Sequence, residues 1–191
     1  IIVNALPIAS VLLPSSDTIC YDGAVAVGFN SQAGITSFSW TSSYGVSNNA
    51  QIPTFTNVTE VGNVYYYGSV EDGNGCVSLV DTILVVVAPS LNLAALSSDV
   101  SCFGYSNGFI DLSAAGGFAP YSFSWSNSAL TEDLSLIPAG NYSVTVNDAS
   151  TCTSSLSVII TEPTSLVANS VESSFIGCNG GNAIIAVTAI G

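Results

Sequence analysis

The sequence predicts an all-β protein built from tandem β-sandwich domains. Apolar and polar residues alternate with a period of two at residues 25–29, 121–125, 142–146 and 156–160, which is typical of strands with one buried face. Clusters of Gly, Asn, Asp and Pro separate these segments and indicate turns, as at residues 72–75. Helical periodicity with capping residues is absent from the sequence.

An internal repeat sets the domain organisation. The tetrapeptide Ser-Phe-Ser-Trp occurs at residues 37–40 and again at 122–125, and each copy contains one of the two tryptophans. A pair of cysteines brackets each copy; these are Cys20 and Cys76 around the first, and Cys102 and Cys152 around the second. The chain therefore holds two related units.

Further matches strengthen the repeat. Counted back from the second cysteine of each unit, Asp72 corresponds to Asp148 and Tyr66 corresponds to Tyr142. Cys178 opens a third copy, so that the first cysteines of the three copies are 82 and 76 residues apart. A period of about 80 residues with roughly seven short strands predicts an immunoglobulin-like β-sandwich for each unit, arranged in an extended array.

Prolines mark the expected domain edges, because they fix φ and hold the preceding residue extended. We expect the end of a preceding module and its joint at 1–7, a first sandwich at 8–89, a second at 90–164, and the beginning of a third, truncated repeat at 165–191. The chain opens at Ile1 without an initiator methionine, which indicates a segment of a longer protein.

Aromatic residues at matching positions predict the core of each sandwich. Period-2 alternation places the Phe and Trp of each Ser-Phe-Ser-Trp segment on one face, and the matched tyrosines are expected to pack and hydrogen-bond like a tyrosine corner rather than to form a ligand site. The expected core residues are Phe38, Trp40, Tyr66, Phe123, Trp125 and Tyr142.

One cysteine pair in each complete unit implies one disulfide per unit, Cys20–Cys76 and Cys102–Cys152. Closing loops of this size should stabilise each unit by roughly 4 kcal/mol, so reduction should lower stability. Cys178 is unpaired in this segment, and the repeat predicts a partner beyond Gly191; a reactive thiol or a metal ligand is the alternative. Disulfides also predict a location outside the cytosol.

The charge composition excludes several classes of function. The chain has 13 Asp and Glu, no Lys, Arg or His, and a net charge of -13. Such a surface argues against binding nucleic acid or anionic lipid. Without His, Lys or Arg there is no imidazole base, Schiff base or phosphate clamp, so we expect no enzyme. The longest aliphatic run, residues 83–88, is far too short to span a bilayer, and any signal peptide is expected to lie outside this segment.

Catalysis by paired carboxylates and calcium binding are the functions of acidic residues that this composition still allows. The acidic groupings are Asp72 with Asn74, Asp17 with Asp22, and Glu132 with Asp133, and none fits a calcium-loop pattern. Adjacent residues on a strand face opposite ways, so Glu132 and Asp133 do not predict a catalytic pair. We expect neither a metal site nor another cofactor.

The second unit resembles a known family. Residues 102–108, 116–127, 131–134, 138–148 and Cys152 are similar to the SprB repeat of giant Bacteroidetes surface adhesins, and the third copy has the same opening. The first unit has Gly-Ile-Thr-Ser at 34–37 where the family has Gly-Gly-x-x-Pro-Tyr, and is closer to PKD-like or immunoglobulin-like modules. The resemblance implies an exported, type IX-secreted surface protein in adhesion or gliding motility, and it carries over no catalytic residue.

Three functional hypotheses follow. The first is a structural segment of a surface filament or adhesin, whose partners are neighbouring repeats and which can self-associate through edge strands. The second is a glycan- or protein-binding module, using the neighbouring rings of Tyr65 and Tyr67. The third is an accessory array of a secreted hydrolase. Thr18 and Thr82, each in an Asp-Thr-aliphatic sequence, are candidates for O-glycosylation.

Overall fold

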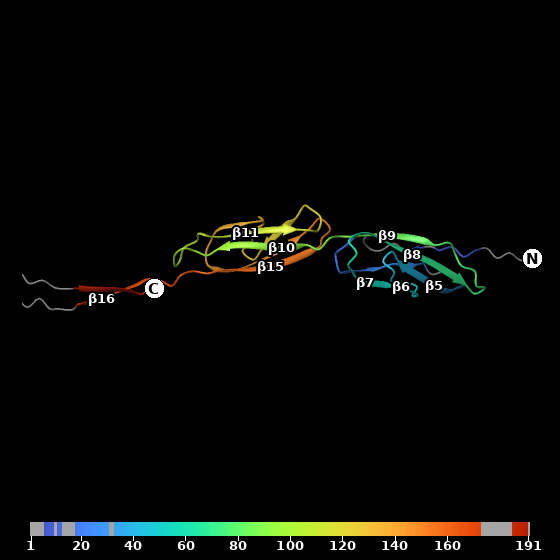
Figure 1. Ribbon diagram of the computed structural model, residues 1–191, viewed down its shortest axis with the longest axis horizontal. Coiled ribbons are helices and arrows are strands. Elements are labelled where there is room, and N and C mark those ends of the chain that lie inside the picture. The colour runs from blue at the N-terminus through green and yellow to red at the C-terminus, as the bar shows by residue number, and fades with distance from the viewer. Residues whose placement is uncertain (1–5, 10, 13–17, 31–32, 173–184, 191) are drawn as a thin grey trace, which may run out of the picture. The chain divides into compact units, whose positions relative to one another are not determined.

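The chain forms strands and turns, and the computed structural model contains no helix in the ranges it describes, residues 6–9, 11–12, 18–30, 33–172 and 185–190 (Figure 1). The predicted all-β class is therefore confirmed. Residue contacts divide the chain into two compact units, each described by itself below. Unit 1 comprises Ile1–Asn92, Ala114–Tyr121 and Val146–Ser154, and unit 2 comprises Leu93–Ser113, Ser122–Thr145 and Ser155–Gly191.

Unit 1 is built on a five-stranded sheet with the order β2-β9-β8-β5-β6. These strands are β2 (Thr18–Ile19), β9 (Asp81–Val87), β8 (Gly62–Asp72), β5 (Ile35–Ser42) and β6 (Ser47–Asn48). Neighbouring strands are antiparallel except β2 and β9, which are parallel. β8 is the longest described strand, with eleven residues, and its alternating sequence buries every second side chain from Val64 to Val70, as expected for a sheet with one face against a core.

Two short sheets complete unit 1. One pairs β1 (Val11–Leu12) with β4 (Gly28–Phe29), and the other pairs β3 (Gly23–Ala26) with β7 (Thr54–Val58). Buried residues of β3, β4 and β7 share one core with those of β5, β8 and β9, which makes the unit a two-layer sandwich. Phe29 stacks on Trp40 with ring centroids 4.3 Å apart, and Phe55 lies 4.7 Å from Tyr66.

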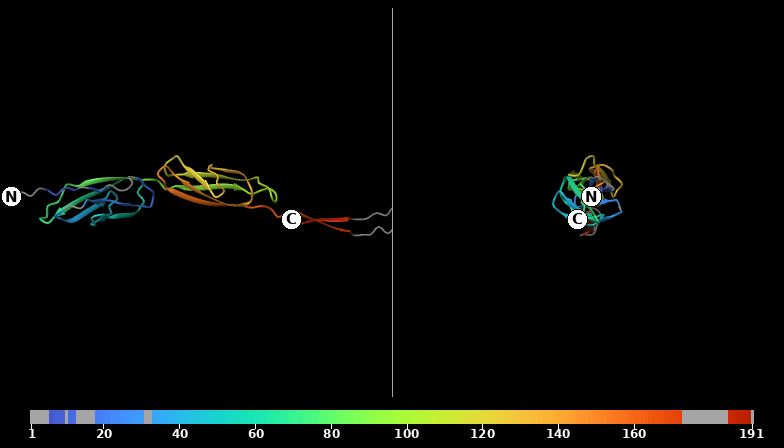
Figure 2. Two further views of the ribbon diagram at one scale, coloured as in Figure 1. Left: turned by 180° about the vertical axis from the view of Figure 1, so that it is seen from behind. Right: turned by 90° about the vertical axis from the view of Figure 1, so that its right-hand side faces the viewer.

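Unit 2 contains two three-stranded sheets, which Figure 2 shows from behind. One sheet has the order β10-β11-β13 and the other the order β12-β14-β15. The strands are β10 (Asn92–Ser98), β11 (Gly108–Ala115), β12 (Ser122–Trp125), β13 (Leu134–Ile137), β14 (Gly140–Asn147) and β15 (Thr153–Ile160). Both sheets contribute buried side chains, with Ile110 and Leu134 from the first and Trp125, Val144 and Ile160 from the second.

A two-stranded hairpin follows. β16 (Val167–Glu172) pairs antiparallel with β17 (Ile185–Ile190) over six residue pairs. Cys178 lies outside the described residues, as do most of residues 1–7. The domain boundaries expected at 89 and 164 stay a prediction, although β9 ends two residues before Pro89 and β15 ends three residues before Pro163.

The aromatic residues selected from the sequence lie on inward-facing positions. Trp40, Tyr66, Trp125 and Tyr142 are buried, and Phe38 and Phe123 are partly buried. Tyr142 donates its hydroxyl to the carbonyl of Pro138 at 2.9 Å, four residues upstream, as a tyrosine corner does. Tyr66 instead lies 3.4 Å from the Tyr44 hydroxyl, and burial together with this contact raises the pKa of Tyr66.

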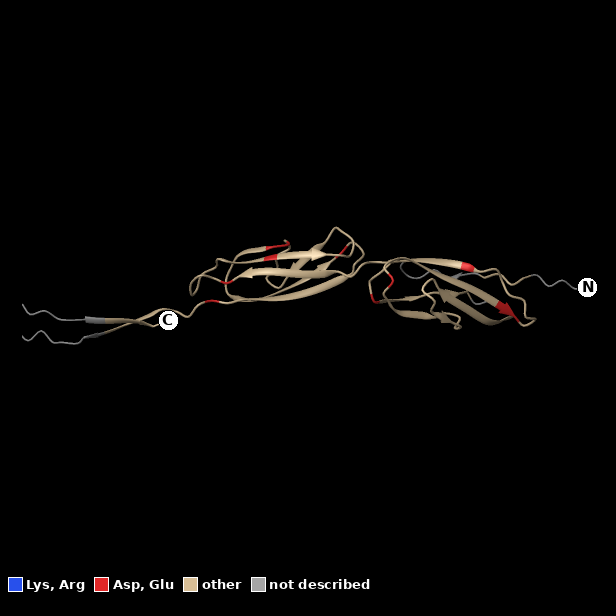
Figure 3. Ribbon diagram, in the orientation of Figure 1, with Lys and Arg blue, Asp and Glu red and all other residues tan. Residues whose placement is uncertain are grey.

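The acidic side chains are distributed along both units, and Figure 3 shows no basic residue among them. In the described part of the chain, no helix is long and apolar enough to cross a membrane.

A glycine holds the aromatic core of unit 1 together at one point. A Cβ added at Gly68 would lie 2.6 Å from both Phe29 and Trp40, because the stacked rings pack directly on the backbone of β8. We expect Gly68→Ala to lower the free energy of unfolding by about 1–3 kcal/mol through overpacking. Urea denaturation of the oxidised chain measures this loss.

Gly73→Ala is the matched control, because its added Cβ would meet only a Thr36 methyl at 3.7 Å, an ordinary contact. Its effect should stay within about 0.5 kcal/mol. Equal losses in the two variants would contradict the packing account.

Candidate functional site

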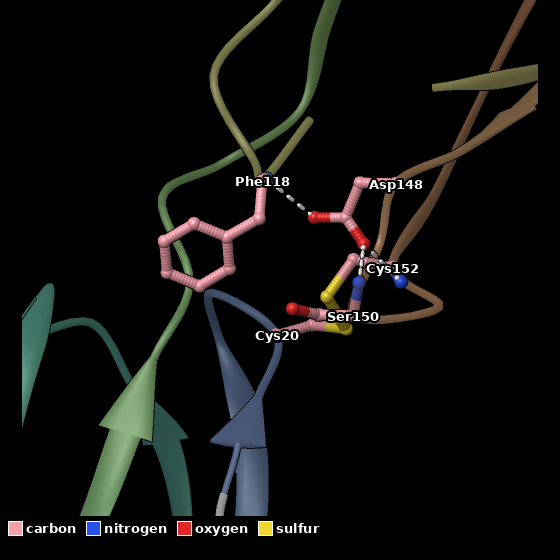
Figure 4. Close-up of a disulfide and its surroundings, with 5 residues drawn as sticks. All are labelled: Cys20, Phe118, Asp148, Ser150 and Cys152. Carbon is pink, nitrogen blue, oxygen red and sulfur yellow. Dashed lines mark hydrogen bonds between the residues drawn. A yellow bond between two sulfur atoms is a disulfide. The ribbon is translucent and has the colours of Figure 1, made fainter. Parts of the chain in front are cut away.

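A tight turn before β15 presents Cys152. Asp148, only 6% exposed, accepts hydrogen bonds at Oδ1 from the backbone N–H of Ser150 at 2.8 Å and of Cys152 at 2.9 Å (Figure 4). Its other oxygen, Oδ2, accepts the N–H of Phe118 at 2.9 Å. Three backbone donors thus compensate the buried carboxylate, which has no cationic side chain to pair with in this chain.

The first repeat forms the same turn. Asp72 Oδ1 accepts the N–H of Asn74 at 2.8 Å and of Cys76 at 2.9 Å, and these bonds lower the pKa of Asp72. In both turns the aspartate N–H also donates to the cysteine carbonyl at 3.0 Å. The residue before each cysteine has a positive φ, 79° for Gly75 and 66° for Thr151. The Asp-x-x-x-Cys turn is therefore a repeated structural element.

Cys152 is bonded to Cys20, with 5.5 Å between the two Cα atoms, and both residues belong to unit 1 (Figure 4). The sequence-based pairs Cys20–Cys76 and Cys102–Cys152 are corrected by this bond. Cys76 is half-buried with a free thiol, and Cys102 is exposed with a free thiol.

Strand direction explains why the first expected pair does not form. Ile19, next to Cys20, pairs with Val87 at the end of β9, and Val87 pairs with Gly62 at the start of β8. Cys76 follows the other end of β8, so the eleven residues of this strand, about 36 Å, separate the two cysteines. A disulfide requires Cα atoms within about 7 Å.

The second expected pair is separated in the same way. Cys152 precedes β15, whereas Cys102 lies near the far end of that strand, where Val100 donates to the Thr161 carbonyl at 3.2 Å and Gly104 donates to Glu162 Oε2 at 2.8 Å. β15 has eight residues, or about 26 Å. The repeat predicted disulfides at all four cysteines, whereas Cys20 and Cys152 are bonded to each other and Cys76 and Cys102 are free, because sequence spacing does not show which end of the sheet each cysteine occupies.

Two glycines let the chain approach this turn. A Cβ at Gly117 would lie 2.6 Å from Asp148 Oδ2, and one at Gly116 would collide with the carbonyl oxygen of Ser90. Both have positive φ, 82° for Gly116 and 58° for Gly117, and Gly117 donates its N–H to the Pro89 carbonyl at 3.2 Å. Only glycine meets both the steric and the conformational requirement here.

The exposed face of the five-stranded sheet carries a second feature. Tyr65 and Tyr67 on β8 are 36% and 40% exposed, and their rings stack with centroids 6.4 Å apart. Leu84 of β9, opposite Tyr65, is also exposed. Tyr65 and Tyr67 are the exposed aromatic pair predicted from the Tyr65-Tyr66-Tyr67 sequence, and together with Leu84 they form a surface called the aromatic patch below.

The remaining sequence candidates lie on strands of the same five-stranded sheet, and Thr82 pairs with Tyr67 of the aromatic patch. Thr18 is partly buried in β2, and Thr82 is exposed in β9. Within the described ranges, no group of three or more His, Cys, Asp or Glu side chains is placed to hold a metal ion.

The segment that contains Gly116 and Gly117 is similar to a known protein family. Residues 94–130 match the SprB repeat. The SprB match runs from within β10 to five residues beyond Trp125, so it includes the Gly-Gly pair and the core tryptophan of unit 2. No curated protein matches the sequence of the chain.

Solved structures show the fold. The chain is similar to a C-terminal 282-residue fragment of intimin, solved with the intimin-binding domain of the translocated intimin receptor, at 15% identity and a TM-score of 0.55 over 84% of this chain and 67% of that one. It is also similar to fibronectin(III)-like modules of Clostridium thermocellum CbhA, at 14% identity and a TM-score of 0.37 over 80% of this chain and 93% of that one. A third similar structure is amphioxus IgVJ-C2, at 15% identity and a TM-score of 0.33 over 75% of this chain and 99% of that one.

The fold of the chain is that of an immunoglobulin-like β-sandwich. Together, the SprB match and the fold support a surface adhesin-type repeat segment, and modules of these kinds are typically non-catalytic structural units.

The two aspartate turns allow a matched test of the hydrogen bond from the Phe118 N–H to Asp148. In Asp148→Asn, the amide oxygen can still cap the turn, but its NH₂ group then faces the N–H of Phe118. We expect a loss of about 1–3 kcal/mol in the free energy of unfolding, because a donor is left without an acceptor. Thermal or urea unfolding monitored by tryptophan fluorescence measures it.

Asp72→Asn is the control, because both backbone bonds of that turn go to one oxygen. We expect a smaller loss there, under about 1 kcal/mol. A loss as large as that of Asp148→Asn would show that the bond to Phe118 contributes nothing.

Proposed function

We propose that this chain is a structural repeat segment of a long extracellular surface filament or adhesin, exported by a bacterium of the Bacteroidetes type, which extends and displays a binding element in adhesion or gliding. The observation that carries the proposal is the Cys20–Cys152 bond, because it joins the first cysteine of one repeat to the second cysteine of the next. Such a bond adds a second covalent connection between consecutive repeats, besides the polypeptide backbone. In this role the chain has no catalytic activity of its own.

The bond also changes which part of the chain carries tension. Cys20 and Cys152 are 132 residues apart in sequence but adjacent in space. Force applied at the two ends of the chain passes from β2 through the disulfide into β15, and the intervening residues are bypassed. A segment that must transmit force without unravelling benefits from this short covalent path.

Single-molecule pulling tests the proposal. The oxidised chain should extend less than the reduced chain by about 450 Å of contour length, because 132 residues at about 3.4 Å each become available only after reduction. Cys20→Ser should behave like the reduced chain without any reductant.

Cys76→Ser is the control and should leave the oxidised extension unchanged, since Cys76 takes no part in the bond. An extension that is the same before and after reduction would rule out a tension-bearing role for the bond.

A binding function is the second candidate, and the aromatic patch favours it. Stacked, exposed tyrosines offer the flat apolar surface on which a sugar ring can lie, with hydroxyls at the edge for hydrogen bonds. The patch stands on regular strands of the largest sheet, so its two rings are held in fixed register.

Glycan-array screening of the oxidised chain separates the two candidates. If the module binds sugar through this patch, replacing both Tyr65 and Tyr67 by Ala should weaken the affinity for the glycan at least tenfold, which corresponds to about 1.4 kcal/mol. Tyr105→Ala, which removes an exposed tyrosine elsewhere, should leave it unchanged. Absence of any glycan signal from the unmodified chain leaves only the structural role.

A further inference from the structure

A pocket beside the free Cys102 shares most of its lining positions with the site of the observed disulfide. It has a volume of about 460 Å³. The residues that line it are Ser101, Cys102, Phe103, Pro163, Thr164, Ser165 and Leu166. The pocket lies within unit 2, and its walls come from the segment after β10 and the segment after β15.

The disulfide site in unit 1 is the repeat-equivalent of this pocket. A pocket of about 190 Å³ there is lined by Cys20, Tyr21, Pro89, Ser90 and Leu91, together with Cys152 and Thr153. The first five correspond in the repeat to Cys102, Phe103, Pro163, Thr164 and Ser165. The two residues without a counterpart at Cys102 are Cys152, which ends the Asp-x-x-x-Cys turn, and Thr153, which begins β15. The larger volume at Cys102 is therefore the space that this turn fills at Cys20.

Among the described residues, Cys76 is the second free cysteine, and it supplies the complementary half. The turn from Asp72 to Cys76 reproduces the backbone bonds within the turn from Asp148 to Cys152. It also reproduces the bond from the residue after the aspartate, since Gly73 N–H donates to the Gly34 carbonyl as Ala149 N–H donates to the Phe118 carbonyl. Pro7 lies in the same pocket as Asp72 and Gly34, as Pro89 lies near the Cys152 turn. Cys76 is thus presented like Cys152.

We propose that the pocket at Cys102 is the docking site for the Asp-x-x-x-Cys turn of a further repeat of this type, whose cysteine forms a disulfide with Cys102. By the same rule, the Cys76 turn docks on the first cysteine of another repeat. The rule is that the first cysteine of each repeat bonds to the second cysteine of the next. This inference rests on the repeat role proposed above and names the partner that the role requires.

Bond formation needs an oxidant, and a small-molecule disulfide such as oxidised glutathione supplies it. The Cys102 thiolate attacks one sulfur of that disulfide, forming a mixed disulfide and releasing one thiol. The thiolate of the docked turn then attacks the Cys102 sulfur, and the second small thiol leaves. Two protein thiols are oxidised, and one disulfide is reduced to two thiols.

A duplicated module tests the pairing. A second copy of residues 90–164 is inserted between Thr164 and Ser165 of the full chain, with Cys178→Ser to remove an uninvolved thiol. The protein is refolded with oxidised and reduced glutathione, free thiols are alkylated, and the bonds are mapped by mass spectrometry after chymotrypsin and Asp-N cleavage, since trypsin has no site in this sequence.

The expected result is loss of Cys102 alkylation and a new bond from Cys102 to the inserted copy of Cys152, with Cys20–Cys152 intact. Cys76 and the inserted copy of Cys102 should stay alkylated. In the chain without the insertion, Cys102 should be alkylated. Cys102→Ser in the duplicated protein should free the inserted copy of Cys152 and leave the Cys20–Cys152 bond unchanged.

A second insertion guards against a module that does not fold in the new position. It places a copy of residues 8–89, with the Cys76 turn, after Thr164, and Cys102 should then bond to the inserted copy of Cys76. Alkylated Cys102 in both proteins, each with its Cys20–Cys152 bond intact, overturns the inference. So does a bond between the two cysteines of one inserted module. Neither result alters the pulling behaviour on which the proposed function depends.

Discussion

Strand β9 pairs with β2 on one side and with β8 on the other, and these two pairings fix where the cysteines of the first repeat lie. Because β2 is parallel to β9, Cys20, which follows β2, lies at the end of the sheet where β9 ends. Because β8 is antiparallel to β9, Cys76, which follows β8, lies at the opposite end. A disulfide within the repeat would have to span the length of the sheet, so the covalent link passes instead from Cys20 to Cys152 of the following repeat. Closing a loop of this length should stabilise the oxidised state by about 5 kcal/mol.

The bond depends on a turn that holds Cys152 in place without any cation. Asp148 is buried, and a buried carboxylate is costly unless it is hydrogen-bonded. Here the N–H groups of Phe118, Ser150 and Cys152 supply the donors, two from the turn itself and one from the loop that follows Gly117. The Gly-Gly pair is what allows that loop to come close enough, so the glycines, the aspartate and the disulfide act as one structural group.

Much of the fold could be predicted from the sequence, because it is encoded locally. Period-2 alternation identified strands, and the repeated tetrapeptide identified Trp40 and Trp125 as inward-facing residues. The disulfide pairing could not be obtained this way, since sequence spacing carries no information about which end of a sheet a residue occupies. That requires the direction and register of β2, β8 and β9, which are long-range properties. One local signal pointed toward the answer: the matched aspartates four residues before Cys76 and Cys152 mark hairpin turns, whereas nothing similar precedes Cys20.

The contacts of the buried and turn carboxylates show how a chain with only acidic charged residues holds these groups in place. With no Lys, Arg or His in the sequence, a carboxylate that is held in place must be held by other donors, and backbone N–H groups at turns and strand ends fill that role. Asp99 accepts the N–H of Thr161 at 2.7 Å, a bond that lowers the pKa of Asp99, and Asp133 accepts the N–H of Leu112 at 2.9 Å. The carboxylates therefore fix turns and strand ends without ion pairs, and the sequence keeps a net charge of -13. Turns and strand ends in this chain are held by backbone donors and by a covalent bond, two interactions that need no basic residue.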